Sequence, residues 1–305
     1  MGVKEYSMGT RPVSQESTRR AHQGRLFDGM PGERPSRKQI AFGWYGGKYS
    51  HLDWLLPLLP ECHHYCEPFG GSAAVLLNRP PSPVETYNDL DGEVVNFFRM
   101  LRDHKDELLY QIGMTPFSRE EFLKAIETNG KGDHLSDLER ARRFFIRARQ
   151  VRTGLAQTAS VGRWANCLNT SRAGMSGAVS RWLGSVEGLE SLAARLLRVQ
   201  IEHDTAANII KRYDSPKTLF YCDPPYPHES RGDAKAYSFE MNDQEHVQLS
   251  QVLHLVKGKV AVSGYQCDLM CELYEDWQIH LDKPKKAMSI KKERQEALWT
   301  NYGSL

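Results

Sequence analysis

The sequence lacks any long hydrophobic run. In its 305 residues no apolar stretch approaches the roughly 18 residues that a membrane-spanning helix needs. The first residues are polar, without the hydrophobic segment of a secretion signal. We therefore expect a soluble, cytoplasmic protein with no membrane partner, long enough to bury a core as one large domain or two smaller ones.

Cysteine is also scarce, since six cysteines spread over the chain do not make a disulfide framework. The spacings of Cys62, His63, His64 and Cys66, and of the cysteines at 267 and 271, could in principle hold a metal. Cys66, however, falls in an expected buried strand, where free cysteine usually acts as a small hydrophobic side chain. We predict no metal site.

Net charge is low as well, at +2, but the positive charge is concentrated in two segments. Residues 1–38 are basic and rich in Gly, Pro and Ser, which predicts a disordered tail. Residues 139–198 contain eleven arginines, no lysine and three glutamates. Arginine without lysine favours bidentate recognition of phosphates and guanine edges. The alternative is an arginine-rich helical face paired with acidic residues elsewhere.

A loop with two prolines carries the strongest chemical signal. Residues 221–226 read Tyr-Cys-Asp-Pro-Pro-Tyr and follow a short apolar run. The prolines make the loop rigid, while the Asp223 carboxylate and the Pro224 carbonyl are hydrogen-bond acceptors. Tyr226 offers a flat aromatic face. This combination suits a planar group with an exocyclic amine, such as adenine, although a simple proline turn after a strand is the alternative.

A glycine-rich turn at residues 67–72 lies between an expected strand and an expected helix. Glycines at such a turn let the backbone approach a nucleotide ligand. The next expected strand, 84–87, is followed by Asp89, at a place where an acid commonly holds ribose hydroxyls. The pattern predicts a nucleoside-cofactor pocket; a dinucleotide site is the alternative, but its third glycine is missing.

The order of expected elements indicates a parallel α/β sheet, because strands alternate with helices. The arginine-rich segment between the two α/β stretches is expected to be mainly helical, over 118–153 and 178–198. We therefore predict three parts, which are a basic tail (1–38), a catalytic domain (39–112 and 199–305) and an inserted recognition domain (113–198).

Six short segments, taken in order, resemble one family. They are residues 44–48, 67–72, 87–89 with 96–98, 223–226, 262–265 and 296–302. Together they are similar to the motifs of the Dam-like group of DNA adenine-N6 methyltransferases, which use S-adenosyl-L-methionine. The resemblance covers most of residues 42–305. Residues 150–155 depart from the pattern of the members that read GATC, so the recognition sequence is not predicted.

The resemblance implies a Rossmann-like methyltransferase sheet with an inserted, mainly helical target-recognition domain. It also implies methyl transfer from S-adenosyl-L-methionine to N6 of adenine in double-stranded DNA, after the base is flipped out of the duplex. A prokaryotic or phage-encoded enzyme associated with the nucleoid is expected, and a cognate restriction endonuclease is a compatible partner. The oligomeric state is not predicted.

Specific residues follow from the motifs and the charge pattern. The catalytic loop is predicted to be Asp223, Pro224, Pro225 and Tyr226. The cofactor is predicted to contact Trp44, Tyr45, Gly47, Lys48, Glu67, Pro68, Phe69, Gly70, Ser72, Asp89, Asp204 and Asp223. DNA is predicted to contact Arg147, Arg149, Arg152, Arg163, Arg172, His228 and Arg231.

Two other functions remain open. Methylation of cytosine N4 would use a similar loop, although such enzymes more often have Ser in place of Asp223. The other alternative is a non-catalytic, sequence-specific DNA-binding protein that has kept the fold, which the presence of Lys48, Asp89, Asp223 and Tyr226 argues against.

Overall fold

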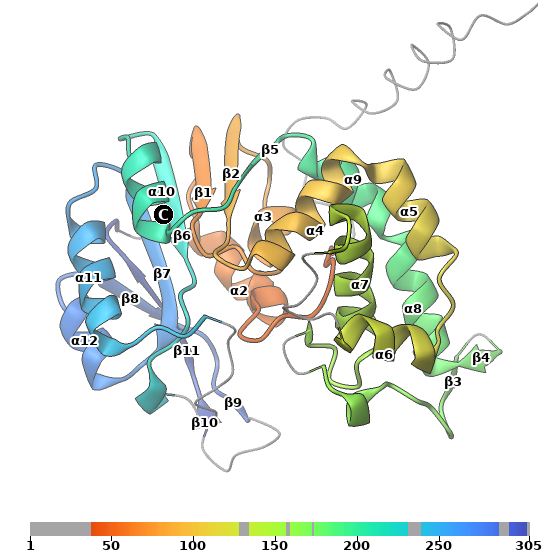
Figure 1. Ribbon diagram of the computed structural model, residues 1–305. Coiled ribbons are helices and arrows are strands. Elements are labelled where there is room, and N and C mark those ends of the chain that lie inside the picture. The colour runs from red at the N-terminus through yellow and green to blue at the C-terminus, as the bar shows by residue number, and fades with distance from the viewer. Residues whose placement is uncertain are drawn as a thin grey trace, which may run out of the picture. The chain divides into compact units, whose positions relative to one another are not determined.

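The centre of the protein is a seven-stranded sheet (Figure 1). The computed structural model describes residues 38–127, 134–156, 159–172, 174–230, 239–286 and 293–303. The predicted tail therefore lies outside the described residues, apart from its last residue. In spatial order the strands are β5 (Val199–Glu202), β2 (Val84–Asn88), β1 (His64–Glu67), β6 (Thr218–Cys222), β7 (Lys259–Tyr265), β11 (Glu296–Thr300) and β8 (Gln278–Leu281).

The predicted parallel α/β sheet is confirmed, because β5, β2, β1, β6 and β7 all pair in parallel. β11 runs antiparallel to both of its neighbours, β7 and β8. The chain order reverses between β1 and β6, which makes the gap between these strands the topological switch point of a Rossmann-like fold. Ligands of such sheets bind outside the carboxyl ends of the strands at this point.

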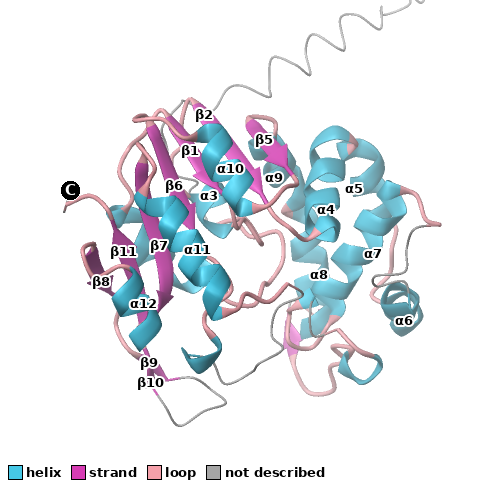
Figure 2. Cartoon of the chain, turned by 60° about the vertical axis from the view of Figure 1, so that its left-hand side comes forward, coloured by secondary structure: helices cyan, strands magenta, loops and turns pink. Residues whose placement is uncertain are grey.

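Both faces of the sheet are buried, as the sequence of β1 illustrates. Tyr65 and Cys66 are adjacent and fully buried, yet they belong to two different hydrophobic clusters because successive side chains point to opposite faces. The Cys66 face packs against α10 (Ala206–Tyr213), α11 (Asp243–His254) and α12 (Asp268–Leu273). Figure 2 shows these helices in front of the sheet.

The Tyr65 face packs against η1 (Lys48–His51), α2 (Leu52–Leu55), η2 (Leu56–Leu58), α3 (Ala74–Asn78) and α4 (Gly92–Asp103). Residues 48–58 form three short pieces, since Pro57 and Pro60 prevent one regular helix. α4 then links the sheet to the helical segment, because it packs extensively against α7 (Asp137–Gln150).

The helical segment contains α5 (Lys105–Gly113), α6 (Arg119–Glu127), α7 (Asp137–Gln150), α8 (Gly177–Glu187) and α9 (Leu189–Leu196). Its loop regions carry η4 (Val161–Arg163) and a small hairpin of β3 (Ser171–Arg172) and β4 (Met175–Ser176). Phe97 of α4 stacks on Phe145 of α7 with ring centroids 5.6 Å apart, and both belong to the cluster that covers the Tyr65 face. The helical segment thus shares a core with the sheet, and its status as a separate domain stays a prediction.

The remaining short elements are η5 (His228–Ser230), β9 (Lys285–Lys286) and β10 (Glu293–Arg294). In the part of the chain that the structure describes, no helix has both the length and the apolar character to cross a membrane.

Candidate active site

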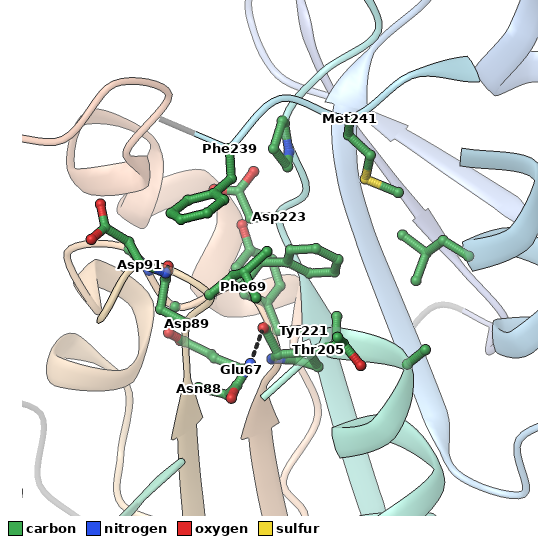
Figure 3. A pocket seen from close by; sticks show the side chains of 18 of the residues that line it. Glu67, Phe69, Asn88, Asp89, Asp91, Thr205, Tyr221, Asp223, Phe239 and Met241 are labelled. Carbon is green, nitrogen blue, oxygen red and sulfur yellow. Dashed lines mark hydrogen bonds between the residues drawn. The ribbon is translucent and has the colours of Figure 1, made fainter. Parts of the chain in front are cut away.

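A pocket of about 810 Å³ opens at the carboxyl ends of β1, β2 and β6 (Figure 3). All residues that the sequence predicts to contact a cofactor line it, namely Trp44, Tyr45, Gly47, Lys48, Glu67, Pro68, Phe69, Gly70, Ser72, Asp89, Asp204 and Asp223. They come from five separate stretches of the chain, and the switch point of the sheet brings them together. The sequence did not single out Phe239 and Met241, which also line the pocket.

The glycine-rich turn after β1 is held against the end of β2. The N–H of Gly70 donates to the Asn88 carbonyl at 2.7 Å, and the hydroxyl of Tyr87 donates to the Gly71 carbonyl at 2.8 Å. A Cβ on Gly70 would lie 2.1 Å from the Tyr87 ring. Glycine is therefore required here for close approach to β2, as well as for access by a ligand.

Asn88, which the sequence did not single out as a site residue, joins two of the loops around the pocket. Its amide nitrogen donates to the carbonyls of Pro68, at 2.8 Å, and Asp204, at 3.0 Å. Its amide oxygen accepts from the N–H of Asp204 at 2.9 Å. The side chain is fully buried, so it acts as a fixed link between the carboxyl ends of β1, β2 and β5. A strand-end asparagine beside an acid is a weak signal in sequence.

Asp89 is placed to bind ribose hydroxyls, and its carboxylate can accept further hydrogen bonds. One carboxylate oxygen accepts from the N–H of Gly71 at 2.7 Å and the other from the N–H of Asp91 at 2.8 Å. Burial raises the pKa of Asp89 to about 6, although these two N–H groups act to lower it. Because each carboxylate oxygen can accept a second bond, Asp89 fits a pair of ribose hydroxyls. Trp44 and Phe69 add aromatic walls suited to a nucleoside.

Lys48 forms an ion pair with Asp223. Its Nζ atom lies 2.7 Å and 2.8 Å from the two carboxylate oxygens and 2.6 Å from the carbonyl of Gly46. Burial acts to lower the pKa of Lys48, but the nearby carboxylates of Asp223 and Glu296 outweigh it and raise the pKa. Burial raises the pKa of Asp223 to about 6, with Lys48 opposing that rise. At neutral pH the pair is therefore ionised.

Tyr226 is 3% exposed and holds the loop through its hydroxyl, which donates to the carboxylate of Glu296. Tyr265 packs edge-on against its ring at 4.8 Å, and the Lys48 ammonium lies 4.9 Å from the ring centroid. Asp223 and Pro225 line the pocket, whereas Pro224 and Tyr226 are buried behind them. The stacking of a base on Tyr226 thus stays a prediction, and Glu296 is a residue whose contact with the loop the sequence did not reveal.

Glu67, at the end of β1, is a buried acid. The Tyr65 hydroxyl donates to its carboxyl group at 2.7 Å. Burial raises the pKa of Glu67 to about 8, more than the bond from Tyr65 lowers it. Glu67 is therefore mostly protonated at neutral pH, which limits the negative charge on the pocket floor beside Asp223.

The predicted contact of Arg147 with DNA stays a prediction, and the position of its side chain does not favour it. Its side chain is 3% exposed, and its guanidinium donates to the Ala125 carbonyl at 3.0 Å and lies 3.7 Å from Glu93. Arg147 lies on the same side of α7 as Phe144, so its side chain is part of the buried interior of the helical segment.

Arg149 is half-buried and donates to the carbonyls of Ile40 and Ala41 at 2.9 and 2.7 Å. Burial lowers the pKa of Arg149 to about 10, which still leaves it charged at neutral pH.

The other arginines of α7 support the alternative of a paired helical face. Arg140 donates to Glu93, and Arg142 and Arg143 donate to Glu139. By contrast, Arg152, Arg163 and Arg172 are exposed in the segment that follows α7, and His228 is exposed in η5. Contacts of these four residues with DNA stay predictions, and Arg231 lies outside the described residues.

No group of three or more His, Cys, Asp or Glu side chains is placed to hold a metal ion within the described ranges. Fold and pocket together define a Rossmann-like α/β protein with a nucleoside-cofactor site at its switch point.

Residues 44–289 match the model of a family described as D12 class N6 adenine-specific DNA methyltransferase. The match covers most of the chain, so the chain belongs to this family. The family predicted from the sequence is confirmed.

Similar proteins point the same way, over shorter stretches. DNA adenine methylases of two Vibrio cholerae serotype O1 strains are 33% identical over 78 residues, which is 25% of this chain and 27% of each relative. The chain thus spans about a quarter of the length of these curated relatives.

Solved structures of methyltransferases match most of the chain with weak superposition. A putative methyltransferase from Streptococcus mutans in complex with SAH is 9% identical, covers 82% of this chain and 96% of that chain, and gives a TM-score of 0.37. The rRNA methyltransferase aviRa from Streptomyces viridochromogenes is 12% identical over 91% of this chain and 92% of that chain, with a TM-score of 0.36.

Proposed function

We propose that this protein is a site-specific DNA methyltransferase that transfers a methyl group from S-adenosyl-L-methionine to N6 of adenine in duplex DNA after base flipping. The observation that carries the proposal is the Asp223 carboxylate. Lys48 fixes it in the wall of the same pocket that Asp89 and the glycine-rich turn form. Membership of the D12 class supports the choice of adenine and of DNA.

The pocket residues fit the cofactor in size and chemistry. S-adenosyl-L-methionine, when bound, supplies an electrophilic methyl group on a sulfonium sulfur. Asp89 would accept its ribose hydroxyls, and Trp44 and Phe69 would pack against its apolar parts. Asp204 also lines the pocket. Its carboxylate accepts hydrogen bonds from Asn208 and Arg212 at 2.8 Å each, which orients its side chain.

The target amine would be held by the loop after β6. Flipping a base out of a duplex costs a few kcal/mol, which binding must offset. Asp223 and the Pro224 carbonyl would then accept the two N6 hydrogens, so that the nitrogen lone pair points toward the methyl group. Positive charge develops on N6 as the new bond forms, and the anionic Asp223 stabilises it. The nitrogen–methyl bond would form as the methyl–sulfonium bond breaks, so the cofactor would leave as a neutral thioether and no covalent enzyme intermediate is needed. The extra proton would then pass from N6 to solvent.

The side that faces DNA is proposed to include the exposed arginines after α7, which are Arg152, Arg163 and Arg172, together with His228 and Arg231, which follow the catalytic loop in the sequence. These side chains could neutralise phosphates or read base edges. The protein would act in the bacterial or phage-infected cytoplasm, on the nucleoid, either alone or beside a cognate restriction endonuclease.

The proposal is tested by incubating the purified protein with duplex DNA and methyl-labelled S-adenosyl-L-methionine, then digesting the DNA to nucleosides. We expect label in N6-methyladenine and loss of that label with Asp223→Ala. Label in N4-methylcytosine would instead support the cytosine alternative, and DNA binding without label would support a non-catalytic protein.

A further inference from the structure

The C-terminal strand β11 contributes a buried carboxylate to the catalytic loop. Glu296 is the first residue of β11, lies opposite Tyr265 of β7 in the sheet register and is 4% exposed. A buried acid is costly unless its charge is paired and its lone pairs are used. Glu296 meets both conditions, because it accepts from the Tyr226 hydroxyl and lies 3.4 Å from the Lys48 ammonium.

The Lys48 ammonium is thereby surrounded by three acceptors. These are the Gly46 carbonyl and the Asp223 carboxylate, to which Lys48 donates, and the Glu296 carboxylate, with which it forms an ion pair. Two carboxylates therefore share one cation in a buried site. Both ends of the catalytic loop are fixed by this arrangement, because Asp223 is bound to Lys48 and Tyr226 is bound to Glu296.

We propose that Glu296 is a positioning residue for methyl transfer, which holds the Tyr226 hydroxyl and the Lys48 ammonium so that Asp223 is presented to the target amine. The inference deepens the proposed function and rests on it. Glu296 does not line the cofactor pocket. It acts through the two residues that flank the reacting groups.

The charge of Glu296 has a consequence that a merely structural acid would not have. Its negative charge is one of the causes that raise the pKa of Asp223, after burial and against the pull of Lys48. Replacing Glu296 by the neutral, isosteric glutamine removes that repulsion but leaves an oxygen that can accept from Tyr226. The pKa of Asp223 should then fall, and the acid limb of the kcat/KM profile should move to lower pH.

The test compares Glu296→Ala, Glu296→Gln, Tyr226→Phe and the double variant Glu296→Ala/Tyr226→Phe in the full chain, with Glu275→Gln as the exposed control. We expect Glu296→Ala to lower kcat by about 10- to 100-fold, because small misplacement of reacting groups costs that much. Cofactor affinity, measured by calorimetry, should change by less than about 3-fold. The double variant should lose no more activity than Glu296→Ala, since both changes break one link.

Three results would overturn the inference. One is an unchanged kcat in Glu296→Ala, another is independent, multiplicative losses in the double variant, and the third is an acid limb in Glu296→Gln that coincides with wild type. If Glu296→Ala does not fold, the acid limb of Glu296→Gln decides alone. If wild type methylates no DNA, the proposed function and this inference both fail; if wild type is active and the variants match it, only the inference fails.

Discussion

The Nζ atom of Lys48 lies within 2.8 Å of both carboxylate oxygens of Asp223, although 175 residues separate the two in the chain. The pair joins the segment that enters the cofactor pocket to the loop that would hold the target base. Lys48 is 2% exposed, so the interaction is poorly screened by solvent. The buried ion pair therefore connects the segment that lines the cofactor pocket with the loop that is proposed to hold the target base.

Lys48→Met should reduce kcat/KM and move its acid limb upward. Wild-type kcat/KM should rise with pH through about 6, because Asp223 must be ionised to accept the amine. Lys48 holds that pKa down, so its removal lets the pKa rise and the limb moves to higher pH. Loss of one partner of a buried pair should also lower stability by about 3–5 kcal/mol.

A pH–rate profile and urea unfolding measure both effects of Lys48→Met. Lys124→Met is the matched control, because Lys124 makes an exposed ion pair with Glu120 in α6. An acid limb that stays in place would show that Lys48 does not set the charge state of Asp223.

Gly70→Ala should abolish cofactor binding. The added methyl would meet the Tyr87 ring at 2.1 Å, so the turn must leave β2 and lose its hydrogen bond to Asn88. Overpacking of this kind costs about 1–3 kcal/mol. Gly184→Ala is the control, because nothing lies within 4 Å of the new atom in the middle of α8, and it should be neutral or stabilising. Calorimetry with S-adenosyl-L-methionine and thermal unfolding would compare the two; wild-type affinity in Gly70→Ala would contradict the geometry.

Arg147→Ala and Arg152→Ala should affect different properties. Arg147→Ala should lower stability by about 2–4 kcal/mol, since it leaves the Ala125 carbonyl without its buried donor and removes one of the arginines beside Glu93, and it should not change the salt dependence of DNA binding. Arg152 is exposed, so Arg152→Ala should spare stability and reduce the slope of log affinity against log salt by about 1. Filter binding at several salt concentrations, with parallel unfolding curves, separates them. The reverse pattern would mean that α7 presents Arg147 to DNA.

Arg149→Ala should weaken cofactor binding although Arg149 does not line the pocket. Its guanidinium holds the carbonyls of Ile40 and Ala41, just before Phe42 and Trp44. Phe42 packs on Phe144 of α7 at 5.0 Å, so this entry segment rests on the helical part. We expect a roughly 5- to 30-fold rise in the dissociation constant of S-adenosyl-L-methionine, from about 1–2 kcal/mol of lost hydrogen bonding. An unchanged dissociation constant would mean that Arg149 contributes only to folding.

Local patterns explain which features the sequence could predict. Strands β6 and β7 contain short apolar runs, and the pocket residues after β1, β2 and β6 stand in turn-like motifs, so these features can be recognised from neighbouring residues. Once the strands are parallel, their carboxyl ends must meet at one edge, and the site follows.

Contacts between distant segments were not predictable in this way. Glu296 stands at the start of a recognisable C-terminal motif, yet its bond to Tyr226 depends on β11 pairing with β7 rather than on either local sequence. The burial of Arg147 cannot be read from the charge of the segment alone. Helical periodicity places it three residues after Phe144, on the buried side of α7, and that signal was present in the sequence.

The most direct test of the central claim is the identity of the methylated base. Duplex DNA treated with the wild-type protein and methyl-labelled S-adenosyl-L-methionine should yield labelled N6-methyladenine on nucleoside analysis, with the signal kept in Glu275→Gln and lost in Asp223→Ala. Labelled N4-methylcytosine, or adenine labelling that survives in Asp223→Ala, would contradict the account.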